Sequence, residues 1–197
     1  LLPWVIWNLD ARAADEGRSF MSRSDDSGKA IGNKVGEQLF NLIVEVQRNP
    51  AHPLLQSDRF FGNGLSNKPL EIIKNGIPQT LSYSRYWAKE QNQEPTGGMY
   101  PIVMTGSAHS VADLIASTER GILVSRAWYV RYVNPRTLEV TGMTRDGTFL
   151  IENGNIPTAY NINRLTLREN AVLAAFSMET YLQAVKYKDA SFQSNGL

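Results

Sequence analysis

Histidine and cysteine set the first limit on the chemistry of this chain. It has no cysteine and two histidines, His52 and His109, and neither histidine belongs to an H-x-H or H-x-x-x-H pair. Disulfides, thiolate catalysis, iron–sulfur clusters and cysteine-type zinc sites are therefore excluded. His109 and Asp113 could share one helix face, but two ligands do not complete a zinc site. His52, which lies between Ala51 and Pro53, is predicted to be a turn residue.

Motifs for phosphate binding and for nucleophilic catalysis are missing as well. The sequence contains neither G-x-x-x-x-G-K-[ST] nor G-x-G-x-x-G, the glycine-rich loops that cradle phosphates. It also lacks the G-x-S-x-G elbow of serine hydrolases. A Ser-His-Asp triad needs no adjacency in sequence, so spacing alone leaves that arrangement open. No catalytic residue is predicted in this chain.

Charged side chains near the N-terminus form one candidate cluster. Asp10, Asp15 and Glu16 could act together as carboxylates, but Arg12 and Arg18 stand beside them. We favour solvated or domain-contact ion pairs, because structural ion pairs outnumber catalytic ones.

Arginine in an aromatic strand provides the second candidate. Arg126 and Arg131 need a carboxylate partner or an anionic ligand if they are buried. The favoured interpretation is a buried ion pair, and the alternative is recognition of a peptide carboxylate. Together with Arg145, these residues are the candidate peptide or ion-pair contacts. The acidic partners considered for the pair are Asp10, Asp15, Glu119 and Glu152.

Hydrophobic periodicity predicts the elements that must position these residues. Helices are expected over 1–21, over Tyr86–Gln91, from a capping box at Ser110-x-x-Asp113, and from Thr166 to about Tyr187. Residues 22–36 are polar and glycine-rich and are expected to form a mobile loop. Strands are expected over Leu39–Val46, Tyr100–Thr105, Ile122–Val133 and Leu138–Thr144, with a turn at Arg145-Asp146-Gly147. Neither face of 122–133 is cleanly polar, so both faces are expected to be covered.

Two Asn-Gly pairs between apolar residues are the strongest local signals. Such pairs favour type I′ hairpins, since that turn needs φ > 0 at both central residues. One hairpin is expected over 70–83 with Asn75-Gly76 at its turn, and the other over 148–162 with Asn153-Gly154. The two hairpins resemble each other, and the sequence leaves two interpretations open: an internal duplication of one strand–turn–strand unit, or two unrelated hairpins.

Composition places these elements in a soluble α+β domain. The chain has 197 residues, 42% hydrophobic and 20% charged, with a formal net charge of +1. We expect a β-rich, largely antiparallel, barrel-like or layered sheet with two to three flanking helices. The near-zero charge gives no reason to expect nucleic acid or an anionic membrane as partner. No apolar run approaches the roughly 20 residues of a membrane span. A cytoplasmic location is expected, since cysteine is absent and no signal peptide is evident.

Long runs of this sequence are similar to one protein family. Residues 1–170 resemble the C-terminal half of TldD/PmbA proteins, which are also called modulators of DNA gyrase. The resemblance weakens after Asn163, where the family usually continues N-F-R-F-N-x-S. The runs that carry it are Leu9–Phe20, Tyr83–Ala88 leading to Pro95-Thr96-Gly97, Ile115–Val124, Trp128–Arg131 and Thr141–Gly154.

The resemblance implies a metallopeptidase family with an α/β N-terminal domain and a β-rich C-terminal domain. Active members carry an H-E-x-x-x-H helix, and a cysteine near the C-terminus can complete the metal site. They pair with a metal-free partner of the same fold, and unfolded peptides enter an enclosed cavity as an added strand. Residues 1–197 would be a single C-terminal-type domain without the N-terminal one. Since residue 1 is not Met, we expect it to lie inside a longer gene product.

This sequence departs from the active pattern at the metal helix. The three ligand positions fall on Pro3, Trp4 and Asn8, none of which replaces His, Glu and His. No metal is therefore expected in this chain, and zinc is expected in a partner chain. We expect a metal-free PmbA/TldE-like subunit, in a homodimer or in a heterodimer with a TldD-like paralogue, with unfolded peptide as ligand. The alternative is a non-enzymatic peptide-binding or regulatory module without a catalytic partner.

Overall fold

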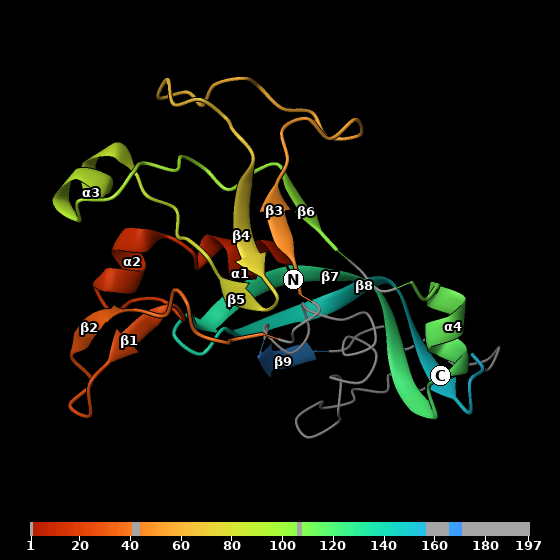
Figure 1. Ribbon diagram of the computed structural model, residues 1–197. Coiled ribbons are helices and arrows are strands. Elements are labelled where there is room, and N and C mark those ends of the chain that lie inside the picture. Colours follow the sequence, from red (N-terminus) through yellow and green to blue (C-terminus); the bar gives the residue numbers. More distant parts are fainter. Residues whose placement is uncertain (1, 41–43, 106–107, 157–165, 171–197) are drawn as a thin grey trace. The chain divides into compact units, whose positions relative to one another are not determined.

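Strands in antiparallel sheets and short helices make up the described part of the protein. The computed structural model describes residues 2–40, 44–105, 108–156 and 166–170 (Figure 1). The chain divides into two compact units. One is Ile6–Thr105, and the other combines Leu1–Val5 with Gly106–Leu197. The α+β, strand-rich and largely antiparallel class is confirmed. The described strands form open two-, four- and three-stranded sheets, and no closed barrel is present among them.

The four-stranded sheet organises the unit Ile6–Thr105. Its strand order is β5-β4-β3-β6, and every pairing is antiparallel. Val46 pairs with Ile73 on one side and with Met104 on the other. The strands are β3 (Val46–Arg48), β4 (Leu70–Lys74), β5 (Ile77–Pro78) and β6 (Ile102–Met104). The strand expected over 39–46 coincides with β3 only at Val46, and residues 41–43 of that range lie outside the described residues.

Both Asn-Gly turns are confirmed. Asn75 and Gly76 have φ values of 49° and 74°, and Asn153 and Gly154 have 50° and 74°. These are the positive values that a type I′ turn requires. The return strand after Gly76 is only β5, so it is shorter than expected. After Gly154, Asn155 pairs back with Glu152, and the remaining arm from residue 157 lies outside the described residues.

Residues 22–36 contain regular structure that the sequence did not reveal. β1 (Ser22–Ser24) pairs antiparallel with β2 (Ala30–Asn33). Asp25 closes the connection, because its carboxylate accepts hydrogen bonds from the backbone N–H groups of Ser27 and Lys29, at 2.9 and 3.0 Å. The expectation of a loop is wrong in this respect, and its mobility stays a prediction.

The helix expected over 1–21 is two short helices. α1 spans Leu2–Trp7 and α2 spans Ala11–Asp15. The break occurs because Asp10 caps α2: its backbone is extended, and its carboxylate accepts a 2.7 Å hydrogen bond from Ala13 N–H. The other two helices agree with expectation. They are α3 (Arg85–Glu90), capped by Ser84, and α4 (Val111–Ala116), with the capping box of Ser110 and Asp113.

A long two-stranded ribbon dominates the described part of the other unit (Figure 1). β7 (Arg120–Asn134) pairs antiparallel with β8 (Glu139–Glu152), and β8 also pairs with β9 (Thr166–Asn170). The helix expected from Thr166 is therefore wrong over 166–170, where sheet pairing overrides the capping-box pattern. The rest of that expected helix lies outside the described residues.

The turn expected at 145–147 is a β-bulge inside β8. Val124 pairs with Thr148 and Arg126 with Arg145, so Asp146 and Gly147 together oppose one residue of β7. Asp146 has a φ of 64° and Gly147 a φ of 122°. An Asp-Gly pair supplies the positive φ that either a turn or a bulge needs, and here it keeps the strand continuous.

A buried arginine forms hydrogen bonds to the loops beside the four-stranded sheet. Arg48 is 3% exposed. Its guanidinium donates hydrogen bonds to the carbonyls of Lys68 (2.7 Å), Thr96 (2.8 Å) and Gly98. It also lies over the ring of Phe61, 5.1 Å from the centroid. Burial lowers the pKa of Arg48, and the carbonyl bonds compensate part of the cost of removing the cation from water.

The ring of Phe61 packs closely against the backbone of Gly97 and Gly98. A Cβ on Gly97 would approach the Phe61 ring to 2.5 Å, and Gly97 has a φ of +70°. We therefore predict that Gly97→Ala lowers the free energy of unfolding by about 1–3 kcal/mol, from strain at positive φ and from overpacking. Urea unfolding measures this change.

Gly62→Ala is the matched control. A Cβ on Gly62 would meet nothing within 4 Å, so its effect is expected to be much smaller. Equal stability of the two variants would contradict this account of the Phe61 contact.

Candidate functional site

Trp4 and Asn8, two of the three positions expected to correspond to the family's metal helix, make structural contacts in this chain. Pro3 is exposed, and the ring of Trp4 meets Tyr132 edge-on at a centroid distance of 4.8 Å. The hydroxyl of Tyr132 donates a hydrogen bond to the Trp4 carbonyl. Asn8 is 5% exposed, and its side-chain oxygen accepts a 3.2 Å hydrogen bond from Phe20 N–H. The amide of Asn8 carries the one side-chain oxygen of the three positions that could bind a metal, and this oxygen already accepts a hydrogen bond from the backbone.

Metal-ligand clusters are absent from the residues that the structure describes: no group of three or more His, Cys, Asp or Glu side chains could hold a metal ion. Asp113, the potential companion of His109, is engaged by the cap of α4. It accepts a 2.8 Å hydrogen bond from Ser110 N–H, and the Ser110 hydroxyl bond lowers its pKa. His52 lies at a turn, as expected, where its Nδ1 accepts from Leu54 N–H at 3.3 Å. A metal-free chain stays a prediction.

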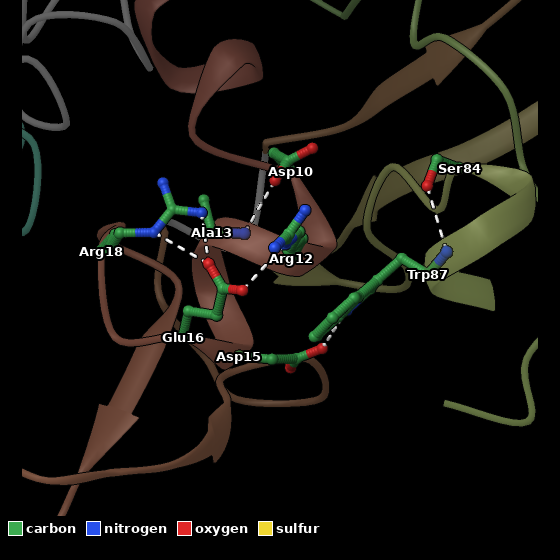
Figure 2. Close-up of polar contacts among 8 residues, drawn as sticks. All are labelled: Asp10, Arg12, Ala13, Asp15, Glu16, Arg18, Ser84 and Trp87. Atoms are coloured by element: carbon green, nitrogen blue, oxygen red, sulfur yellow. Dashed lines mark hydrogen bonds and ion pairs between the residues drawn. The ribbon is translucent and has the colours of Figure 1, made fainter. Parts of the chain in front are cut away.

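The acidic cluster on α2 is an ion-pair and hydrogen-bond network (Figure 2). Glu16 accepts from Arg12 at 2.8 Å and from Arg18 at 2.6 Å. Asp15 accepts from the indole N–H of Trp87 at 2.7 Å, and Figure 2 shows the two side chains pointing toward one another. Each carboxylate has a structural partner, so the favoured interpretation of ion pairs is confirmed for Glu16. Asp10 serves instead as the cap of α2.

Arg126 has an acidic partner that the sequence did not suggest. Its Nε lies 2.8 Å from Asp146, and Arg145 lies 3.5 Å from the same carboxylate. The side chains of all three are about half exposed (50–52%). The expected buried pair, with Asp10, Asp15, Glu119 or Glu152 as partner, is wrong. The bulge in β8 lies opposite Ser125 and brings the Asp146 carboxylate within ion-pair distance of Arg126. Because a turn was expected at 145–147, nothing in the sequence indicated a pairing of these two residues.

Two aromatic rings and two arginines form a continuous stack on the β7–β8 ribbon. Arg145 lies 4.6 Å from the centroid of the Trp128 ring, and Arg131 lies 5.4 Å from that of Tyr129. The two rings meet edge-on at 4.3 Å. We call these four residues, Arg145, Trp128, Tyr129 and Arg131, the aromatic–arginine stack. Trp128 is 37% and Tyr129 56% exposed, so the expectation that both faces of β7 are covered is wrong here.

A second bulge brings the two rings together. Trp128 pairs with Met143 and Arg131 with Thr141, so Tyr129 and Val130 oppose Gly142. Tyr129 has a φ of 53°, which is strained for an aromatic residue. Neighbouring side chains of a regular strand point to opposite faces, and the bulge breaks that alternation. Sequence reasoning missed Trp128 and Tyr129, and Gly142 was the available signal, because a Cβ there would lie 3.2 Å from the Trp128 carbonyl.

An open pocket of about 510 Å³ lies in the unit Ile6–Thr105. Phe60, Phe61 and Tyr100 contribute rings to its lining, together with Asp58 and Asn67. Burial raises the pKa of the Tyr100 phenol. The residues that line this pocket include no histidine, cysteine or lysine.

A family model matches almost the whole chain. The model is described as the PmbA/TldA metallopeptidase C-terminal domain, and it covers residues 1–189. The chain belongs to this family. No curated protein matches it.

Solved structures share the fold of this PmbA/TldA-type domain. TldE from Thermococcus kodakarensis is 21% identical with a TM-score of 0.64, over 86% of this chain and 40% of that one. Two proteins assigned as modulators of DNA gyrase also match. The one from Bacteroides thetaiotaomicron is 23% identical (TM-score 0.65, 85% and 36% covered) and the one from Thermotoga maritima is 21% identical (TM-score 0.66, 85% and 38% covered). The chain therefore spans 36–40% of the length of these three structures.

The network at Glu16 predicts a specific pH dependence. The hydrogen bond from Arg12, followed by that from Arg18, holds the pKa of Glu16 below its ordinary value of 4.5. A depressed pKa contributes stability above the ordinary value, and the contribution is lost as pH falls through the lowered one. Glu16→Gln should therefore lose stability at neutral pH and show a smaller decrease between neutral and acidic pH. Urea unfolding across that range measures the difference.

Glu94→Gln, at an exposed position, is the control. Its free energy of unfolding should change with pH as that of the unmodified protein does. A Glu16→Gln curve parallel to the unmodified one would show that the ion pairs do not contribute.

Proposed function

We propose that this chain is the metal-free type of PmbA/TldD domain and helps to form a chamber that binds unfolded peptides, with the catalytic zinc in a partner chain. The observation that carries the proposal is the state of the metal-helix positions. Pro3 and Trp4 offer no ligand, and the amide oxygen of Asn8 is taken up by Phe20 N–H. Zinc-bound water is the nucleophile of such peptidases, and it needs three protein ligands.

The ribbon provides the feature that suits a peptide-binding role. β7 is 15 residues long and pairs with β8 along one edge in the described part of the chain. An exposed strand edge can accept an extended peptide as an added strand. Exposed aromatic and arginine side chains on the same ribbon match the composition of binding hot spots.

A dimer with a metal-bearing paralogue in the cytoplasm follows from this proposal. No helix among the described residues is long and apolar enough to cross a membrane. The second candidate is a peptide-binding or regulatory module without a catalytic partner. It is favoured by the same exposed ribbon, and the identity of co-purifying proteins separates the two candidates.

Metal content and reconstitution test the proposal. The purified protein should contain far less than one zinc per chain after dialysis against zinc, and it should not cleave an unfolded polypeptide by itself. Adding a paralogue that carries H-E-x-x-x-H should produce a complex that cleaves the polypeptide, with the paralogue alone as control. Stoichiometric zinc together with peptidase activity from this protein alone would overturn the proposal. Binding of peptide without any paralogue in native pull-downs would favour the second candidate.

A further inference from the structure

The side chains of the aromatic–arginine stack are held in place by contacts with one another, and the backbone at Tyr129 is strained. Tyr129 is held at a φ of 53° while its ring is 56% exposed, so burial of the ring does not account for the strain. Strained conformations of this kind cluster at binding sites, where the surrounding structure fixes them. The bulge places the rings of Trp128 and Tyr129 in contact, and each ring supports one guanidinium. The arrangement fixes two cations on one exposed surface.

Among the side chains that the structure describes, this surface carries three arginines and one carboxylate. Arg126 and Arg145 share the single carboxylate of Asp146. Among the residues that the structure describes, Arg131 has no acidic side chain within ion-pair distance, and its recorded partner is the Tyr129 ring. A guanidinium stacked on a ring keeps its in-plane N–H donors available, and that fork matches a carboxylate. The surface is therefore complementary to a carboxylate at Arg131.

We propose that the aromatic–arginine stack binds a carboxylate of an extended peptide, with Arg131 as the carboxylate-binding residue and the rings of Tyr129 and Trp128 against the neighbouring apolar groups. This inference rests on the proposed peptide-binding function. The carboxylate is either an Asp or Glu side chain or the C-terminus of the peptide, since both offer the same pair of oxygens.

Nucleic acid is the less suitable ligand for this surface. Backbone binding of nucleic acid depends on several cations that each neutralise a phosphate. Here two of the three arginines already face Asp146, and the formal net charge of the whole chain is only +1.

Fluorescence anisotropy with three labelled peptides tests the proposal. The first has a central Glu and a blocked C-terminus, the second has Gln in place of Glu, and the third is the Gln peptide with a free C-terminal carboxylate. The Glu peptide should bind about two- to fivefold tighter than the blocked Gln peptide, toward the upper end of what one exposed charge pair contributes. A gain for the third peptide and not the first would assign the site to the C-terminus.

Variants identify the residue responsible. Arg131→Gln should remove the preference for the carboxylate and leave the affinity of the blocked Gln peptide nearly unchanged, and Arg131→Lys should restore it only in part. Tyr129→Gly fits the positive φ without strain, so it should fold and bind all three peptides more weakly. Arg136→Gln, an exposed arginine beyond the stack at the end of the same ribbon, is the matched control and should retain the preference.

Each outcome decides the inference. Binding of all peptides without a carboxylate preference, or a preference that survives Arg131→Gln, overturns it while leaving peptide binding intact. Failure to bind any peptide overturns both this inference and the peptide-binding part of the proposed function. Tighter, salt-sensitive binding of oligothymidylate than of the Glu peptide would assign the surface to nucleic acid and overturn the proposal.

Discussion

The buried guanidinium of Arg48 is the interaction on which the architecture of the unit Ile6–Thr105 depends. It lies at the end of β3 and joins three backbone carbonyls from loops that are distant in sequence. These loops have no strand partners of their own at Lys68, Thr96 or Gly98, so the arginine satisfies acceptors that burial would otherwise leave unpaired. The Phe61 ring contacts both this cation and the Gly97–Gly98 backbone, so Arg48 supports the loops and also one wall of the open pocket.

In the other unit, two β-bulges determine which side chains of the β7–β8 ribbon come into contact. A regular β7–β8 ribbon would alternate its side chains, and neither the pair of Arg126 with Asp146 nor the contact of Trp128 with Tyr129 would form. Both bulges need positive φ, which Asp146, Gly147 and Tyr129 provide. The candidate peptide-binding surface is therefore a consequence of local backbone conformation. Residue type drew attention to Arg131 and Arg145, but the contact of Trp128 with Tyr129 depends on the bulge.

Local signals in the sequence predicted the elements whose cause is itself local. The Asn-Gly turns and the capping box of Ser110 with Asp113 follow from the conformations and hydrogen bonds of a few adjacent residues. Failures arose where pairing at long range decided the outcome. Asp146-Gly147 suits a turn or a bulge equally, and only the pairing with β7 distinguishes them. The partner of Arg126 was missed for the same reason. The break in the first helix has a local cause, the cap formed by Asp10, which apolar periodicity does not detect.

Family membership and the side chains at Pro3, Trp4 and Asn8 support the central proposal, which is that this domain contributes a binding surface to a metallopeptidase and leaves the metal to a partner. Trp4 packs against Tyr132 and the Asn8 side chain accepts a backbone hydrogen bond, while Pro3 is exposed and has no ligating atom in its side chain. An anomalous difference map at the zinc edge, from crystals of the complex with an H-E-x-x-x-H paralogue, tests the claim most directly. The account predicts a zinc peak in the paralogue and none beside α1 of this chain. A zinc peak bound by residues of this chain would contradict it.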